Sequence, residues 1–265
     1  KHLTMAPDRF FRFQKASRWI QHLAKGMNPP IRILDVGARE NCLQSFLPEI
    51  SVIELDIQPP DSPSPFIHGR LPELPIQTGS IPIVTCLDVF EHIPAHHRIP
   101  ALRELIRITS GALIIAFPHQ NPVSVQQEKM LAQIFENVHG HPCDFLSEHA
   151  RFGLVDTPPL LSILNDHFPH TRVEYSFPIH HWFISHLIDT SLALIPNSIL
   201  IRDTLQTWFN HLPDTPASAE SAYRTFLIAG PPFTDPPVDS PESLPPLPSG
   251  SALPESFRDI AAIIH

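Results

Sequence analysis

Apolar runs bounded by turn residues recur along the chain and predict seven β-strands. Each run is short and rich in Val, Ile, Leu or Phe, which is typical of strands buried inside a sheet. Pro82 restricts the fourth strand to a start near Ile83, because proline donates no backbone hydrogen bond. The predicted strands are residues 31–36, 51–57, 66–68, 81–87, 111–117, 173–177 and 223–229.

Most segments between these strands carry apolar residues at the helical spacing of three to four positions, and they predict helices. Strands that alternate with helices indicate an α/β fold. We therefore expect a Rossmann-like, doubly wound, mostly parallel seven-stranded sheet with helices on both faces, in three αβα layers. The predicted helices are residues 8–25, 43–47, 94–109, 122–138 and 158–168, with an apolar pair at 181–195 and 198–212.

Composition divides the chain into a domain and a tail. Residues 1–230 are predicted to form one domain, in which the apolar helical pair, about 180–212, is an insertion that caps the sheet edge. Alternatively, this pair forms an apolar groove for a lipid-like acceptor or rests on a membrane surface, although it has few basic residues. Residues 231–265 are rich in proline and serine and predict a linker, with a short helix at 256–264. Docking of the Pro-Pro runs to a protein partner is the less favoured interpretation.

Charge and cysteine content exclude several classes of protein. A net charge of −9 with scattered lysines and arginines argues against a nucleic-acid partner. The 3 cysteines are far apart, no signal-peptide pattern is visible, and the longest apolar segment is interrupted by His186, Asp189 and Pro196. We therefore expect a cytoplasmic protein without stable membrane insertion. The 17 histidines show no zinc-ligand spacing, so no metal is expected.

Two residues at strand ends suit a nucleotide cofactor. Gly37 directly follows the first strand, where a glycine lets the backbone turn sharply and approach a ligand. Asp56 ends the second strand about 20 residues later, where a carboxylate accepts hydrogen bonds from ribose hydroxyls. Any α/β domain supplies one glycine and one acid, so this pair alone is weak evidence.

The run DVFEHIP at residues 88–94 carries a more specific signal. Together with ILDVG at 33–37 and the segment 74–87, it resembles the fourth-strand region of class I S-adenosylmethionine (SAM) dependent methyltransferases. The resemblance covers roughly residues 30–120, and YRTFLIA at 223–229 fits the family's seventh, antiparallel strand. It implies an antiparallel last strand, SAM as the cofactor and methyl transfer as the activity.

Position by position, this resemblance implies ten cofactor-binding residues. Asp56 is expected to hold the ribose hydroxyls, Ile57 to pack on adenine, and the segment 69–71 to border the adenine ring. The methionine end of SAM is expected to lie near the first and fourth strand ends. The ten residues are Asp35, Gly37, Ala38, Arg39, Asp56, Ile57, Gly69, Leu71, Leu87 and Asp88.

The chain departs from the family pattern in its glycine loop, where Arg39 and Asn41 replace two glycines. Arg39 either obstructs SAM or pairs with the SAM carboxylate through its planar guanidinium, and we favour retained binding. Arg70 also replaces an acid that often lies near the adenine amino group, and Pro82 replaces an aspartate before the fourth strand.

Methyl transfer from a sulfonium needs in-line positioning of the nucleophile and, for a hydroxyl or amine, removal of a proton. His92 and His119 follow the fourth and fifth strands and are the predicted catalytic residues, because histidine titrates near neutrality. The structural alternative for Glu91 and His92 is a hydrogen-bonded turn that caps the helix beginning at Pro94.

Four residues are predicted to contact the acceptor. Asn121 follows the fifth strand, and the other three lie beyond the helix predicted at 122–138. A surface loop anchored by Phe152 is an equally good interpretation of the latter three. The predicted acceptor residues are Asn121, His149, Arg151 and Phe152.

The sequence thus predicts a SAM-dependent methyltransferase with a small-molecule acceptor, and oxygen is the acceptor atom expected first. The alternative is a catalytically degenerate methyltransferase fold that serves as a binding or scaffold module. A nicotinamide oxidoreductase is disfavoured, because the GxGxxG motif is absent and DVFEHIP has no role in hydride transfer.

Overall fold

The computed structural model describes residues 5–38, 42–60, 64–196, 198–212, 214 and 218–236. Arg39 and Asn41 of the divergent glycine loop lie outside these residues. The predicted helix at 256–264 and most of the predicted tail also lie outside them. The expectations for these segments therefore stay predictions.

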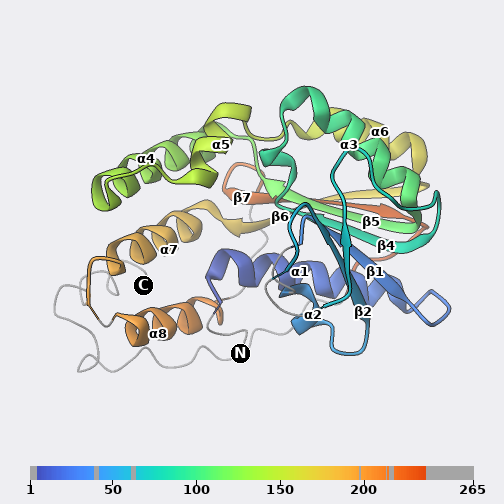
Figure 1. Ribbon diagram of the computed structural model, residues 1–265, viewed down its shortest axis with the longest axis horizontal. Helices are drawn as coiled ribbons and strands as arrows, with labels where there is room; N and C mark the ends of the chain where they lie inside the picture. Colours follow the sequence, from blue (N-terminus) through green and yellow to red (C-terminus); the bar gives the residue numbers. More distant parts are fainter. Residues whose placement is uncertain are drawn as a thin grey trace.

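The strands form one seven-stranded sheet in the order β3-β2-β1-β4-β5-β7-β6 (Figure 1). Neighbouring strands are parallel except for β7, which runs antiparallel to both β5 and β6. The predicted mostly parallel sheet with an antiparallel last strand is confirmed. The strands are β1 (Arg32–Val36), β2 (Ser51–Asp56), β3 (Phe66–His68), β4 (Ile81–Leu87), β5 (Thr109–Pro118), β6 (His170–Pro178) and β7 (Ala222–Gly230).

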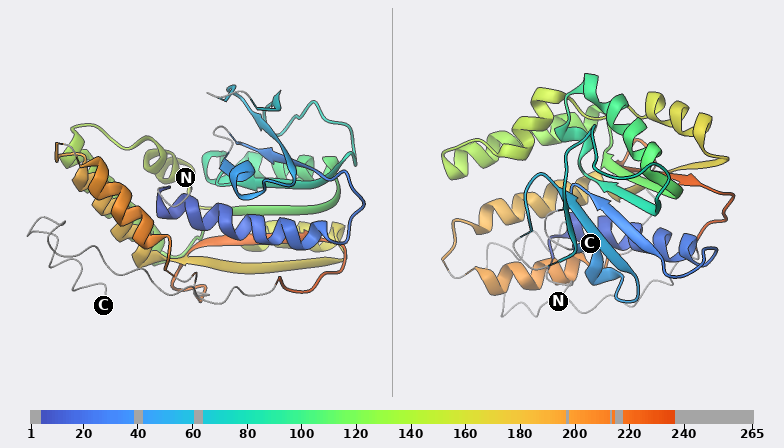
Figure 2. Two further views of the ribbon diagram at one scale, coloured as in Figure 1. Left: turned by 90° about the horizontal axis from the view of Figure 1, so that it is seen from below. Right: turned by 45° about the vertical axis from the view of Figure 1, so that its right-hand side comes forward.

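Helices cover both faces of the sheet (Figures 1 and 2). Successive strand residues point to opposite faces, so neighbours in β1 join different cores. Ile33 belongs to the core that contains Trp19 and Ile20 of α1, whereas Leu34 belongs to the core that contains Leu102 of α3. These layers are the three predicted ones. The covering helices are α1 (Pro7–Ala24) and α2 (Cys42–Phe46) on one face, and α3 (Ala95–Ile108) and α6 (Thr157–His167) on the other.

Four further helices gather beyond the carboxyl ends of β5 and β6 (Figure 1). In this group α7 packs against both α4 and α8, and Trp182 of α7 stacks on Tyr223 of β7 with ring centroids 4.1 Å apart. The predicted apolar pair corresponds to α7 and α8, which lie near the carboxyl ends of β5 and β6. The four helices are α4 (Pro122–His139), α5 (Asp144–Phe152), α7 (Ile179–Leu192) and α8 (Ile199–Phe209).

The structure differs from the predicted element boundaries in two places that matter. β4 begins at Ile81 and includes Pro82, and its register with β5 shifts between Ile81 and Ile83, so that the proline lies at an irregularity of the ladder. Helix α5 occupies the segment that the sequence left open as a loop, and it turns His149 into the interior. Within the described residues, no helix combines the length and the apolar character that crossing a membrane requires.

Candidate functional site

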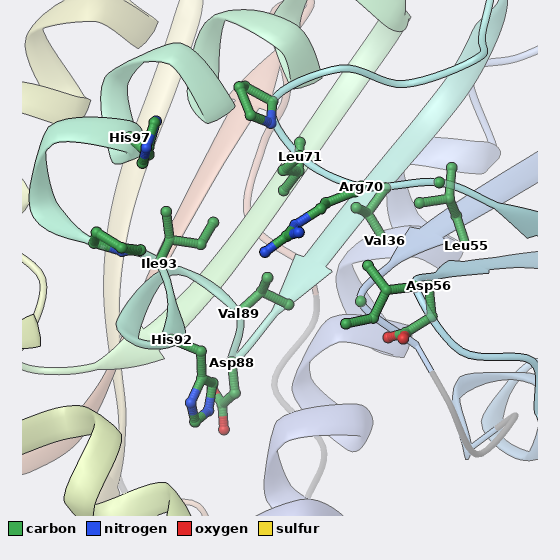
Figure 3. Close-up of a pocket in the computed structure, with 15 residues that line it drawn as sticks. Val36, Leu55, Asp56, Arg70, Leu71, Asp88, Val89, His92, Ile93 and His97 are labelled. Carbon is green, nitrogen blue, oxygen red and sulfur yellow. The ribbon is translucent and has the colours of Figure 1, made fainter.

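A pocket of about 590 Å³ opens at the carboxyl ends of β1, β2 and β4 (Figure 3). The chain order reverses between β1 and β4, and ligands of parallel α/β sheets bind at such a switch point. Several residues that were predicted from sequence meet here although they come from four separate segments. The predicted site residues that line the pocket are Gly37, Asp56, Ile57, Gly69, Leu71, Asp88 and His92.

At one end of the pocket, Asp56 and Ile57 provide a polar and an apolar surface. Oδ1 of Asp56 accepts a hydrogen bond from the backbone N–H of Gln58 at 3.0 Å, which orients the carboxylate. Ile57 is 53% exposed and lines the pocket, so its side chain offers an open apolar surface there. Gly69 N–H donates to the carbonyl oxygen of Asp56 at 3.1 Å, which holds the end of β3 next to the end of β2. A carboxylate beside an open apolar surface suits a ribose joined to a flat base.

Gly37 turns the chain at the β1 end with a φ of 80°, in the left-handed region that favours glycine. Its N–H donates to the carbonyl oxygen of Leu55 at 2.7 Å, and the N–H of Ala38 points to the same oxygen at 3.3 Å. The side chain of Val89 packs directly against Gly37, so that a Cβ atom there would lie 2.2 Å from Val89 Cγ2. Both the backbone angle and the close contact therefore require glycine.

We predict that Gly37→Ala lowers the free energy of unfolding by about 1–3 kcal/mol, because the added methyl group meets Val89 and the backbone is strained. Val89→Ala removes the clash but not the strain, so the double variant should recover part of the loss. Urea unfolding of the three variants measures this. Equal stability of Gly37→Ala and wild type would contradict the packing described here.

Asp88 lies at the other end of the pocket and is tied to two arginines from distant segments. It adopts a φ of 54°, which aspartate tolerates better than most residues. Its carboxylate is paired with Arg12 of α1 and with Arg224 of β7, whose Nε donates to Oδ1 at 2.9 Å. Burial alone would raise the pKa of Asp88, but the two guanidinium groups outweigh it and lower the pKa to about 2. Asp88 is therefore ionised and firmly held.

His92 lies beside Asp88 on the short helix η2 (Phe90–His92) and lines the same pocket. Its Nδ1 is 2.6 Å from the carboxylate of Glu148, and its ring centroid is 5.1 Å from that of His149. Burial, and then the neighbouring His149, lower the pKa of His92 below its usual value. The imidazole is neutral at pH 7 and can accept a proton there.

Glu91 and His149 complete a buried polar group around His92. The side chain of Glu91 is 1% exposed, and burial followed by the negative charge of Asp88 raises its pKa well above the usual value. His149 is 4% exposed and lies within 3.1 Å of Glu128, which also accepts a hydrogen bond from the Tyr223 hydroxyl at 2.8 Å. His149, predicted to contact the acceptor, thus lies next to the predicted base.

Other predicted residues lie away from the pocket. Asp35 is buried in the sheet, where its Oδ1 accepts a hydrogen bond from the Thr85 hydroxyl at 2.6 Å, and Leu87 is packed in the core on the α1 side. His119 is half-buried, and its Nδ1 lies 2.7 Å from the hydroxyl of Thr225. Burial lowers the pKa of His119, but its ring does not line the pocket described here.

Three predicted acceptor residues, Asn121, Arg151 and Phe152, lie outside this pocket and contact neighbouring groups of the protein. Asn121 caps helix α4, since its Oδ1 accepts a hydrogen bond from the Ser124 N–H at 2.8 Å. Arg151 is exposed, and its guanidinium lies over the ring of Phe152 at 5.1 Å. None of the three lines the pocket at the strand ends.

The structure also brings residues to the site that sequence reasoning did not assign. Val89, Ile93 and His97 line the pocket as well, and so does Arg70, which belongs to the segment 69–71 expected beside adenine but was given no role of its own. Three of them belong to or follow DVFEHIP, so the motif itself was the available signal. Arg224 had another signal, because it is the one charged residue of the strand predicted at 223–229.

No protein-family model matches this chain, and no curated protein matches it by sequence. Among solved structures, it is similar to the plantazolicin methyltransferase BpumL in complex with S-adenosylhomocysteine (SAH), with 13% identity over 86% of each chain and a TM-score of 0.51. It is also similar to a SAM-dependent methyltransferase from Archaeoglobus fulgidus, with 13% identity, coverage of 82% of this chain and 92% of that one, and a TM-score of 0.47.

The sheet order, the antiparallel β7 and the likeness to BpumL agree on one architecture. The chain has the fold of class I SAM-dependent methyltransferases. At 13% identity this likeness concerns the fold alone.

Proposed function

We propose that this chain binds SAM in the pocket at the strand ends and transfers its methyl group to a small-molecule acceptor, with a hydroxyl oxygen as the nucleophile. The observation that carries the proposal is the meeting of Asp56, Ile57 and Gly37 in one pocket at the switch point of the sheet. Its volume, about 590 Å³, lies within the range of small-molecule sites.

The pocket residues fit the parts of SAM one by one. In this proposal the ribose hydroxyls donate to the Asp56 carboxylate, whose orientation the Gln58 N–H already holds. Adenine packs on the exposed side chain of Ile57 and lies beside the segment that contains Gly69 and Leu71. The methionine end then passes along Gly37 toward the other end of the pocket. SAM supplies an activated methyl group on a sulfonium.

His92 is the residue we assign to proton removal from the acceptor. It lines the pocket, and its lowered pKa leaves the ring unprotonated at pH 7. When Nδ1–H donates to Glu148, Nε2 carries the lone pair that takes the proton of the acceptor hydroxyl. His119 was the other predicted base, but its contact with Thr225 and its place outside the pocket favour His92.

The test is calorimetric binding of SAM and SAH to the wild type and to Asp56→Ala. A charged acceptor of two ribose hydrogen bonds contributes about 1.5–3 kcal/mol, so the variant should bind about tenfold to a hundredfold more weakly. Asp166→Ala, which removes an exposed carboxylate on α6, is the control and should bind like the wild type.

Failure of the wild type to bind either ligand at millimolar concentration would reject the proposal. It would favour the alternative predicted from sequence, a degenerate fold that acts as a binding or scaffold module. Arg39→Ala, in the part of the loop that the structure does not describe, remains the second test: weaker SAM binding indicates a contact with the SAM carboxylate, and tighter binding indicates an obstruction.

A further inference from the structure

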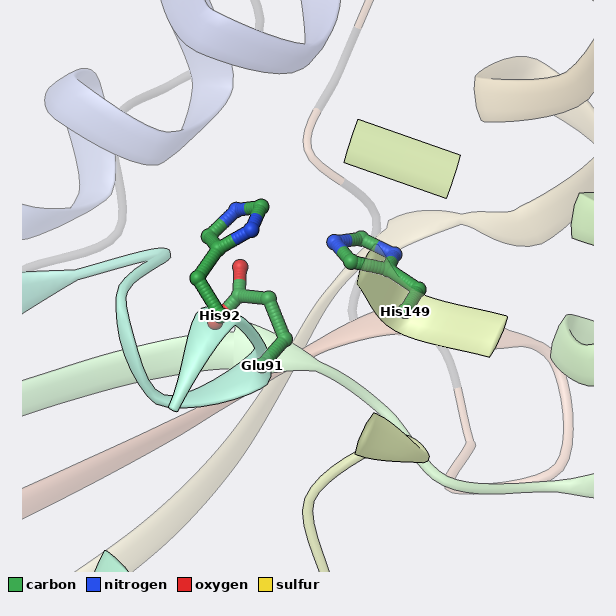
Figure 4. Close-up of side chains that lie close together, drawn as sticks. All are labelled: Glu91, His92 and His149. Carbon is green, nitrogen blue, oxygen red and sulfur yellow. The ribbon is translucent and has the colours of Figure 1, made fainter. Parts of the chain in front are cut away.

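We propose that Glu91, His92 and His149 bind a divalent transition-metal ion, for which zinc is the model, at the end of the pocket. One potential ligand atom from each residue lies within 4.8 Å of the other two. Glu91 and His92 come from η2 and His149 from α5, and Figure 4 shows the carboxylate of Glu91 and the two rings facing a common space. Two imidazoles and one carboxylate form a recognised set of ligands for such ions.

Two buried atoms of this group have no hydrogen-bond partner. They are Nε2 of His149, whose side chain is 4% exposed, and Oε2 of Glu91, whose side chain is 1% exposed. Buried polar atoms almost always find a partner, and leaving one unpaired costs about 1–3 kcal/mol. A cation between them would satisfy both atoms at once. This pair of orphaned atoms is independent of the spacing of the three residues and points to a ligand.

The surroundings of His149 match those of metal-binding histidines. Such a histidine usually binds the metal with one ring nitrogen while the other donates to a carboxylate, which fixes the tautomer and the ring orientation. Nδ1 of His149 is 3.1 Å from Glu128, and Glu128 is itself held by the hydroxyl of Tyr223 at 2.8 Å. Nε2 is left with its lone pair. The ring of His92 is similarly held by Glu148 through Nδ1 at 2.6 Å.

The type of ion follows from the ligands. Mg²⁺ and Ca²⁺ prefer oxygen ligands throughout, whereas Zn²⁺ and Fe²⁺ accept imidazole nitrogen. In a tetrahedral zinc site with bonds of about 2.0–2.1 Å, ligand atoms lie about 3.4 Å apart, so small side-chain rotations close the group around the ion. Burial, followed by the negative charge of Asp88, raises the pKa of Glu91, and a bound cation would oppose that rise.

The role of this ion rests on the proposed function. Three protein ligands leave a coordination position open, as in catalytic zinc sites, and His92 borders the pocket. An acceptor hydroxyl at that position would release its proton to solvent water more easily, because the cation stabilises the alkoxide that remains. His92 then serves as a ligand, and the ion replaces it as the group that promotes proton loss. The expected acceptor class is therefore an alcohol, a phenol or an enol.

The experiment measures ion binding without SAM, so it does not depend on cofactor binding. Protein treated with a chelator is titrated with Zn²⁺ by calorimetry and with Co²⁺ by visible absorption. We expect one ion per chain in the wild type. Glu91→Gln leaves the His92 and His149 imidazoles in place and keeps the side-chain size. This variant and His92→Ala should each weaken ion binding by about a hundredfold or more. Glu128→Gln, which loosens His149, should weaken it by about 10–100-fold.

The control is His97→Ala, because His97 lines the same pocket, is exposed and is not part of the group. It should bind like the wild type. His92 is 32% exposed, so its variant tests the proposal even where changes at the buried Glu91 disturb folding. The proposal is overturned when the wild type binds no ion below about millimolar, or when His92→Ala and Glu91→Gln bind as tightly as the wild type. If the wild type binds SAM but no metal ion, the metal site is rejected and the proposed function is unaffected.

Discussion

Arg224→Met is expected to lower the free energy of unfolding by about 3–5 kcal/mol, the largest stability effect that we predict. Arg224 is 1% exposed, and its guanidinium contacts Asp88 and also the Asp8 carboxylate at 2.8 Å. Methionine fills a similar volume but leaves Asp8 without this partner and Asp88 with Arg12 alone. A buried carboxylate that loses its cation keeps the cost of burial without the compensating attraction.

A double-mutant cycle separates the ion pair from simple packing loss. Asp88→Asn should also destabilise, whereas Arg224→Met combined with Asp88→Asn should cost clearly less than the sum of the two single changes. Arg103→Met replaces an exposed arginine of α3 and should stay within about 0.5 kcal/mol of the wild type. Urea unfolding at pH 7 measures all four variants. Additive single effects would show that the two side chains do not act as a pair.

The contacts of Arg224 also position the end of the pocket. Asp88 comes from the loop after β4, Arg224 from β7, and Arg12 and Asp8 from α1. These four side chains therefore connect the end of the pocket with an outer helix and with the antiparallel strand. We expect Arg224→Met to weaken SAM binding as well, because Asp88, the next residue Val89 and the nearby His92 all line the pocket.

Asp35 should make the protein less stable as the pH rises from about 4 to about 7. Burial raises the pKa of Asp35 from 3.8 to about 7, although the hydrogen bond from Thr85 and the charge of Arg12 partly oppose this. In that window the folded protein keeps a proton that the unfolded chain has lost, so each pH unit favours unfolding by about 1.4 kcal/mol. The effect is fully expressed above pH 7 and amounts to about 4 kcal/mol at most.

Asp35→Asn removes this titration and keeps an oxygen for the Thr85 hydroxyl. The free energy of unfolding of the variant should rise steadily relative to that of the wild type between pH 4 and pH 7. Above pH 7 the difference between the two should stay constant. Asp166→Asn, at an exposed position, is the control and should follow the wild type throughout. Urea unfolding at four pH values measures the difference. Parallel curves for Asp35→Asn and the wild type would contradict an elevated pKa.

The amino-acid sequence was sufficient for the layers of the fold and for one end of the site. Strand and helix periodicities are local, and alternation along β1 already assigns Ile33 and Leu34 to opposite faces. Parallel strands bring their carboxyl ends to one edge, so Gly37 and Asp56 had to approach one another once the strand order was known. Their meeting in one pocket could therefore be predicted without knowledge of any side-chain contact, and their part in cofactor binding stays a prediction.

The other end of the site depends on contacts that no local pattern contains. Arg12 and Arg224 reach Asp88 only after α1 and β7 have packed on the sheet, and His149 reaches Glu91 only because α5 folds back over η2. Their spacing along the chain resembles no motif, which is why the sequence predicted no metal. For the same reason it allowed two interpretations of His149, as a residue of the acceptor pocket or as part of a surface loop. Burial, the pKa values and the unpaired atoms of these side chains are properties of that packing, since each arises from removing water around charges that meet only in three dimensions.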